Sequence, residues 1–166
     1  MLRLRPYKAC DANEIAGWFK DEYTFRQWSA DRYASYPLVP KMINDYYEAE
    51  KFNDGMWEMT AFDENGIVGH MIMRFPSTDK NELRFGFIAV SDKLRGKGYG
   101  KQMLLLAIDY AFLFIKVSKI TLGVFENNER AKKCYLSCGF REIEGKSESY
   151  RCMGETWKTI EMELIK

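Results

Sequence analysis

The sequence predicts one domain with an α/β (α+β) fold, in which about four helices flank a mixed central sheet. Its 166 residues suffice for one domain with a full core. Helical and extended patterns alternate along the chain without repeats, low-complexity tracts or linkers. A strand, a long apolar helix and another strand follow one another over residues 83–125, which is typical of a right-handed parallel crossover. We therefore expect a single domain over residues 1–166.

The first half of the chain predicts a strand, two helices and a strand pair. Residues 2–9 alternate apolar and basic side chains, as a half-buried strand does. A helix should follow Asp11, which has a glutamate three residues later and so resembles a capping box. The aromatic stretch 22–37 shows no regular period and is expected to be irregular. The elements expected after it are a helix over 41–51 and two strands within 56–75, joined by a turn at Asn65-Gly66.

The second half predicts the remaining strands and two further helices. Residues 82–90 are apolar almost throughout, which favours a central strand. The fourth helix should begin after an asparagine cap and close at Gly139. The elements expected after residue 90 are a helix over 100–116, a strand over 119–125, a helix within 127–140 and a closing strand over 159–165.

Composition limits the partners of the protein. A net charge of +1 lacks the basic excess that is typical of nucleic-acid binders. The N-terminal residues lack the apolar core of a signal peptide, and the longest apolar stretch, 103–115, is short and contains Asp109. The sequence therefore predicts a cytoplasmic protein without nucleic-acid or membrane partners.

The cysteines and the single histidine favour no metal site. Cys134 and Cys138 are four residues apart on a predicted helix and could share a metal. His70 is remote in the sequence, and no CxxC motif is present. Buried reduced thiols and a strand histidine without a catalytic role are the favoured interpretations, so no metal is expected.

The stretch "LRGKGYG" at residues 94–100 predicts an anion site. Glycines let backbone N–H groups approach a ligand, and a helix N-terminus carries partial positive charge. A P-loop is excluded because Gln102 stands where Ser or Thr is required, and a dinucleotide fingerprint would need glycine in place of Lys101. Arg95, Gly98 and Gly100 instead fit the pattern Arg/Gln-x-x-Gly-x-Gly/Ala between a strand and a helix.

Two motifs follow one another along the chain. The first is "FIAVSDKLRGKGYGKQML", which contains the glycine turn, and the second is "VFENNERAKKCYLSCGF". Together they resemble the GNAT superfamily of acyl-CoA-dependent N-acetyltransferases. The first is similar to the acetyl-CoA motif of the superfamily, and the second to its Asn-x-x-Ala-x-x-x-Tyr-x-x-x-Gly-Phe segment. The resemblance is nearest to the branch with ribosomal-protein N-terminal and small-amine acetyltransferases. It implies a GNAT-like sheet that splays at the acetyl-CoA site.

The resemblance implies acetyl-CoA as co-substrate and a set of residues that bind it. The backbone of one strand should pair with the pantetheine arm, and the glycine turn should bind the pyrophosphate. Lys101 either neutralises phosphate charge or is a solvated helix lysine, and Asn128 either bonds pantetheine or only caps its helix. The implied cofactor-binding residues are Ile88, Ala89, Val90, Arg95, Gly96, Lys97, Gly98, Tyr99, Gly100, Lys101 and Asn128.

The resemblance also implies transfer of acetyl from acetyl-CoA to a primary amine by direct attack on the thioester. Tyr135 would be the general acid that protonates the leaving thiolate, unless it only packs in the core. The Val90 N–H would bind the oxyanion. Many relatives use a strand glutamate as base, but the corresponding positions here are Arg84 and Gly123. Glu82 and Glu126 are weak candidates for the base, and proton loss from the amine to water is the simplest remaining account.

The acceptor is a small-molecule amine or a protein or peptide amine. Aromatic side chains with interspersed carboxylates in the first helical region suit a cationic amine, although most of these aromatics are expected in the core. A non-catalytic acyl-CoA-binding module and an enzyme for another acyl donor remain alternatives, as do a monomer and a homodimer. The candidate wall comprises Trp18, Phe19, Tyr23, Phe25, Trp28, Tyr33, Tyr36, Asp21, Glu22 and Asp31, with Tyr150, Glu155 and Trp157 opposite.

Overall fold

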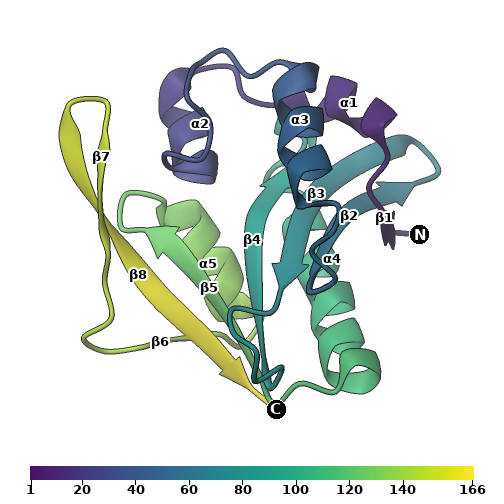
Figure 1. Cartoon of the computed structure of the whole chain (residues 1–166), viewed down its shortest axis with the longest axis vertical. Coiled ribbons are helices and arrows are strands. Elements are labelled where there is room, and N and C mark those ends of the chain that lie inside the picture. Colours follow the sequence, from purple (N-terminus) through teal and green to yellow (C-terminus); the bar gives the residue numbers. More distant parts are fainter.

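A computed structural model describes all residues, 1–166, as one mixed sheet covered by helices on both faces (Figure 1). The strands are β1 (Arg3–Pro6), β2 (Met56–Asp63), β3 (Gly66–Arg74), β4 (Glu82–Val90), β5 (Lys119–Phe125), β6 (Arg141–Glu142), β7 (Ser149–Cys152) and β8 (Glu155–Ile165). The helices are α1 (Ala12–Ala16), α2 (Glu22–Ser29), α3 (Pro40–Glu50), α4 (Tyr99–Asp109), which continues as a π-helix over Tyr110–Ile115, and α5 (Glu129–Ser137). The predicted fold class is confirmed.

The sheet is antiparallel except at its centre. The strand order is β1-β2-β3-β4-β5-β8-β6, with β7 paired to the outer part of β8. Strands β4 and β5 form the one parallel pair, and α4 connects them. This connection is the strand-helix-strand crossover that the sequence predicts.

The parallel pair is short, and this opens the sheet. Only Glu82, Leu83 and Arg84 pair with β5, opposite Lys119 to Thr121. On its other edge β5 pairs along its whole length with β8, whereas the rest of β4 pairs only with β3. Figure 1 shows β4 and β5 diverging from their starts toward the glycine turn and α5. The splay expected from the resemblance is therefore present.

Alternating side chains of the central strands build two apolar layers. Met71 and Met73 of β3 belong to a cluster of 19 buried residues that includes Leu104 of α4. Ile72, between them, belongs to a cluster of 11 buried residues with α1, α2 and α3. Because successive strand residues point to opposite faces, one strand holds both helical layers to the sheet.

Two details of the N-terminal region differ from the sequence-based expectation. Residues 22–29, expected to be irregular, form α2, so five α-helices are present rather than about four. The Asp21 carboxylate caps α2 by accepting from the Thr24 N–H at 2.7 Å, and Phe25 is fully buried. The helix spans only eight residues, about two turns, which is too short for its period to stand out in the aromatic stretch.

The expected capping role of Asp11 at α1 is wrong. Its carboxylate accepts two hydrogen bonds from Arg5, at 2.7 and 2.9 Å, and one from the Thr60 hydroxyl at 2.7 Å. The side chain is fully buried and joins the first helical layer to β1 and β2. Desolvation opposes its ionisation, but these hydrogen bonds outweigh that cost and lower its pKa to about 2.

No helix in the structure has both the length and the apolar character that a bilayer crossing requires.

Candidate active site

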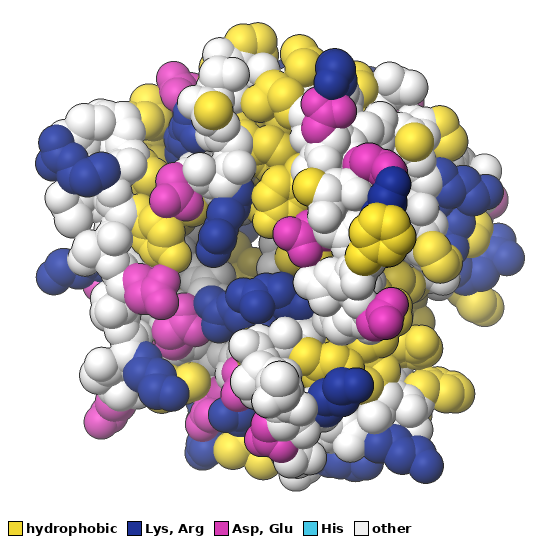
Figure 2. All heavy atoms as spheres, in the orientation of Figure 1, with side chains coloured by type: hydrophobic (Ala, Val, Ile, Leu, Met, Phe, Trp, Pro, Cys, Tyr) yellow, Lys and Arg dark blue, Asp and Glu magenta, His cyan; other side chains and the backbone are white.

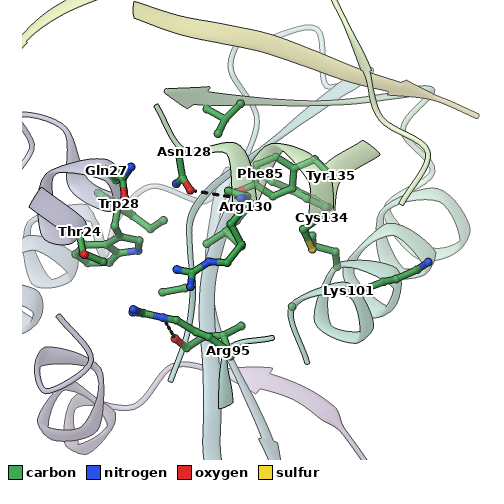
Figure 3. A pocket seen from close by; sticks show the side chains of 18 of the residues that line it. Thr24, Gln27, Trp28, Phe85, Arg95, Lys101, Asn128, Arg130, Cys134 and Tyr135 are labelled. Carbon is green, nitrogen blue, oxygen red and sulfur yellow. Dashed lines mark hydrogen bonds between the residues drawn. The ribbon is translucent and has the colours of Figure 1, made fainter. Parts of the chain in front are cut away.

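A first cavity of about 310 Å³ lies where β4 and β5 diverge. Its walls come from the end of β4, the glycine turn, the first turn of α5 and one side of α2 (Figure 3). Beyond Arg84 the β4 edge that faces β5 has no strand partner, so an extended ligand can pair with it as an added strand. The predicted site residues that line the cavity are Ile88, Ala89, Val90, Arg95, Gly96, Gly98, Gly100, Lys101, Asn128 and Tyr135.

The glycine turn has a backbone geometry that depends on its glycines. Gly96 and Gly98 have φ of 77° and 84°, in the left-handed region that favours glycine. Gly98 is the N-cap of α4, so the turn presents the unpaired N–H groups of the helix N-terminus at the cavity. This arrangement suits a phosphate or pyrophosphate group.

A second helix N-terminus reaches the same cavity. Asn128 caps α5 by accepting from the Ala131 N–H at 3.3 Å, as one of its two predicted roles requires. Arg130 follows in the first turn and also lines the cavity. Sequence reasoning missed Arg130, although a cation in the first turn of a helix opposes the helix dipole and so indicates a function.

Arg95 and Arg130 together make the first cavity electropositive. The Arg95 guanidinium donates to the Val90 carbonyl at 3.2 Å and to the Trp18 carbonyl at 3.0 Å, which fixes the turn against β4 and the end of the α1 segment. Burial of the Arg95 guanidinium lowers its pKa, and repulsion from Arg130 lowers it further. Neither arginine has a carboxylate partner, and Figure 3 shows their side chains projecting into the same space.

Two predicted cofactor residues lie outside the cavity lining. Lys97 is exposed at the tip of the turn, and the Tyr99 hydroxyl donates to Asp63 at 3.0 Å, away from the cavity. Lys101 lines the cavity, but Figure 3 shows its ammonium pointing away from the two arginines. Only the backbone N–H groups of Lys97 and Tyr99 thus remain as candidates for ligand contact.

A β-bulge in β4 marks the middle of the open edge. His70 pairs with Ala89 and Ile72 pairs with Gly86, so Phe87 and Ile88 both stand opposite Met71. Phe87 has φ of 47°, which is unusual for a residue with a large side chain. A bulge leaves backbone groups without ladder partners, and such features are common next to active sites. The sequence carried no signal for it.

Tyr135 of α5 combines core packing with a position in the cavity wall. The residue is 6% exposed, and its ring packs against Phe140. Its hydroxyl has no hydrogen-bond partner within the chain, and burial raises the pKa of this phenol. The phenol is therefore protonated at neutral pH and free to donate to a ligand atom.

The two carboxylates suggested as general bases lie outside the cavity. Glu82 binds Lys119 at 2.8 Å and accepts from the Thr121 hydroxyl at 2.5 Å, at the start of β4. Glu126 is exposed beyond the end of β5. Neither lines either of the two large cavities, so water is the remaining candidate.

Arg84 and Gly123, the two departures from the family pattern, form one structural unit. Arg84 makes two hydrogen bonds to Glu161 of β8, at 2.6 and 3.0 Å, across the intervening strand β5. A Cβ at Gly123 would lie 2.8 Å from the Glu161 carboxylate and 2.9 Å from the Arg84 guanidinium. Glycine at 123 therefore leaves the space in which this ion pair crosses β5, and a larger residue would displace the ends of both side chains.

A second cavity of about 410 Å³ lies on the other side of the gap. The two cavities share Trp28, Phe87 and Gly123 in their walls, so they meet between β4 and β5. Tyr150 lines the second cavity, as the acceptor wall requires. The expected carboxylate lining is wrong, because neither cavity contains the side chains of Asp21, Glu22, Asp31 or Glu155.

The single histidine and the four cysteines form no metal-binding group. His70 is fully buried, and burial lowers its pKa to about 4, so it is neutral. Its Nε2 lies 2.5 Å from the Tyr47 hydroxyl. All four cysteines are free, and no group of three or more His, Cys, Asp or Glu side chains is placed to hold a metal ion.

The sequence profile of the Acetyltransferase (GNAT) family matches residues 12–140, which is most of the chain. The chain belongs to this family, as the two motifs predict. The uncharacterized N-acetyltransferase YokL of Bacillus subtilis is 27% identical over 105 residues, 63% of this chain and 59% of that protein. The uncharacterized N-acetyltransferase YycN of the same bacterium is 33% identical over 90 residues, 54% of this chain and 56% of that protein. The matches thus span less than two thirds of these relatives.

Two matches that cover more of the chain are with spermidine acetyltransferases. The spermidine N(1)-acetyltransferase of Escherichia coli K12 is 26% identical over 148 residues, 87% of this chain and 74% of that protein. The solved structure of Vibrio cholerae spermidine N-acetyltransferase in complex with CoA and spermine superposes with a TM-score of 0.83 at 21% identity. That superposition covers 99% of this chain and 95% of the other and shows that the fold is shared.

Proposed function

We propose that the protein is an acetyl-CoA-dependent N-acetyltransferase that acts on a primary amine. One observation carries the proposal: two helix N-termini and two arginines without carboxylate partners converge on the open edge of β4. This combination offers an anion site for pyrophosphate beside an unpaired strand edge for an amide-containing arm. CoA has both groups, and membership of the family supports this assignment.

In the proposed reaction the amine nitrogen attacks the thioester carbon and forms a tetrahedral oxyanion. A backbone N–H of β4 stabilises it. The Val90 N–H is one candidate donor, and the bulge adds the N–H groups of Phe87 and Ile88. The C–S bond then breaks, and the products are an acetylated amine and CoA thiol.

Tyr135 supplies the proton that the leaving thiolate requires. Its raised pKa keeps the phenol protonated at neutral pH, but makes it a weaker acid than a free thiol of pKa about 8.5. The phenolate must therefore regain a proton in the same step, and the positively charged nitrogen of the tetrahedral intermediate supplies it. Water removes the first proton from the ammonium form of the acceptor before attack.

The acceptor is a small-molecule amine, with a protein or peptide amine as the broader alternative. The polyamine names of the relatives support small amines as a class. The ribosomal-protein N-terminal branch, the cytoplasmic location and the choice between monomer and homodimer stay predictions. A non-catalytic acyl-CoA-binding module is the second candidate, and the missing strand glutamates favour it only weakly, since Tyr135 faces the cavity.

The test is thiol release from acetyl-CoA with a panel of amines, with Tyr135→Phe and Tyr110→Phe compared. Tyr110 lies outside both cavities and controls for loss of a tyrosine hydroxyl. We expect Tyr135→Phe to lower kcat by about 10²- to 10⁴-fold while calorimetric acetyl-CoA binding is retained. Binding without thiol release for any amine would favour the non-catalytic module, and absence of CoA binding would contradict both candidates.

A further inference from the structure

The second cavity carries an excess of positive charge. Its charged lining residues are Arg32, Arg74, Arg84, Glu50 and Glu161. Glu161 is neutralised by its two hydrogen bonds with Arg84. Figure 2 shows Lys and Arg side chains along the hollow in the middle of the face on which this cavity opens, with Asp and Glu side chains beside them. The lining of the cavity thus has one more arginine than carboxylates.

The Arg74 side chain is the main source of positive charge without a partner in the second cavity. The residue is half-buried, and its guanidinium has no ion pair and no hydrogen bond in the chain. It stands directly opposite Arg84 in the antiparallel pairing of β3 and β4. Like charges in this position destabilise a sheet, so the fold bears a cost here that a bound anion would relieve.

The carboxylates near Arg74 relieve that cost only in part, since Glu50 attracts the guanidinium without forming an ion pair with it. Glu50 of α3 accepts a hydrogen bond from the Asn53 amide at 3.1 Å and forms no ion pair. Glu161 is taken by Arg84. Arg32, in the loop after α2, is exposed at the same cavity and adds a second guanidinium without a carboxylate partner.

The arginines are separated from the phosphate site of the first cavity. Arg84 lies near the start of β4, whereas the glycine turn follows its end. Ile88 at the bulge is four residues from Arg84, about 13 Å along a strand that rises about 3.3 Å per residue. A compact acceptor can therefore place its amine at the gap between the strands and another group at Arg74.

We propose, on the basis of the acetyltransferase function proposed above, that the acceptor is an amine that also carries an anionic carboxylate or phosphate group, which Arg74 binds together with Arg32 and Arg84. A polyamine fits this lining less well than an anionic amine, because the lining holds three arginines and two carboxylates, and one carboxylate is already paired with Arg84. The specificity would thus differ from that named for the spermidine acetyltransferases, whose fold the chain shares.

The test uses pairs of acceptors that differ only in the anionic group. The carboxylate pair is lysine and cadaverine, the phosphate pair is glucosamine 6-phosphate and glucosamine, and spermidine is the polyamine. For each, kcat/KM is measured by thiol release, and binding to the CoA-loaded protein by calorimetry. The variants are Arg74→Gln, Arg74→Lys and the control Arg151→Gln, at an exposed β7 arginine outside both cavities.

We expect one anionic amine to exceed its partner and spermidine at least tenfold in kcat/KM. Arg74→Gln should lower kcat/KM for that amine about 10- to 100-fold, the range of a charge-assisted hydrogen bond, and leave its partner nearly unchanged. Arg74→Lys should retain part of the preference, since lysine keeps the charge but loses the bidentate fork. Arg151→Gln should change neither value.

Two outcomes would overturn the proposal: spermidine or the amine without the anion is preferred, or Arg74→Gln leaves the preference unchanged. If no amine releases thiol, the proposed acetyltransferase function fails, and calorimetry then decides the binding proposal separately. Tighter binding of an anionic amine that is lost in Arg74→Gln would support it. Equal binding within both pairs would contradict it.

Discussion

The two cavities that meet between β4 and β5 are built in different ways. The first takes half of its lining from one contiguous stretch, 85–101, and its candidate ligand groups are mostly backbone N–H groups. The second takes its lining from the α2 and α3 regions and strands β3, β4, β5, β7 and β8, and its candidate ligand groups are side chains. A backbone site can be found from a local motif, whereas a side-chain site depends on which distant residues the fold brings together.

The largest expected effect concerns the side-chain site. Glu161→Gln should leave the Arg84 guanidinium without its carboxylate and lower the free energy of unfolding by about 3 kcal/mol, the low end for a broken buried ion pair. The measurement is urea denaturation. The double variant Arg84→Met/Glu161→Leu should recover part of the loss, because no lone charge remains. Additive losses in the double variant would show that the pair does not act as a unit.

The next largest effect is expected from Asp11, which, like Glu161, joins segments that are distant in the sequence. Its folded-state pKa of about 2 lies below the ordinary value of 3.8. A depressed carboxyl pKa adds stability above the unfolded-state pKa, and this stability is lost as pH falls from about 5 toward 2. The total is about 2 kcal/mol.

Urea denaturation from pH 6 down to pH 2.5 measures this linkage. The stability difference between wild type and Asp11→Asn should shrink as pH falls. Asp45→Asn, at an exposed carboxylate paired with Lys41, serves as control and should shift the pH dependence little. A difference that is constant with pH would contradict the low pKa of Asp11.

In the first cavity, where backbone N–H groups are the candidate ligands, Gly98→Ala should weaken acetyl-CoA binding about tenfold while the protein stays folded. A residue with a Cβ at φ 84° costs about 1 to 2 kcal/mol in the left-handed region, so the turn would relax and displace its N–H groups. Calorimetric titration with CoA measures this. Gly145→Ala, at φ 73° outside both cavities, is the matched control for strain and should leave CoA affinity unchanged.

The smallest expected effect lies where the two cavities share a wall. Asp21→Ala removes the cap of α2, which carries Gln27 and Trp28 into both cavities, and should cost about 1 kcal/mol of stability. Thermal unfolding measures it. Asp21→Asn retains a capping oxygen and should be nearly neutral; equal losses in both variants would mean that the cap does not stabilise α2.

The sequence by itself determined the features that depend on neighbouring residues. The crossover from β4 to β5, the hairpin between β2 and β3, the Asn128 cap and the glycine turn before α4 all follow from local pattern, and so does the family. These predictions succeed because backbone conformation and amphipathic period are set within a few residues. α2 was missed because a helix of eight residues is too short for its period to stand out.

Only the tertiary structure decided the rest. It brought Arg130 beside Arg95, placed the bulge opposite Met71, and paired Arg84 with Glu161 across a glycine that had seemed a mere departure from the family pattern. It also set Arg74 without a carboxylate partner in the second cavity. Charges far apart in the sequence interact through distance and burial, and a sequence contains neither until the chain has folded.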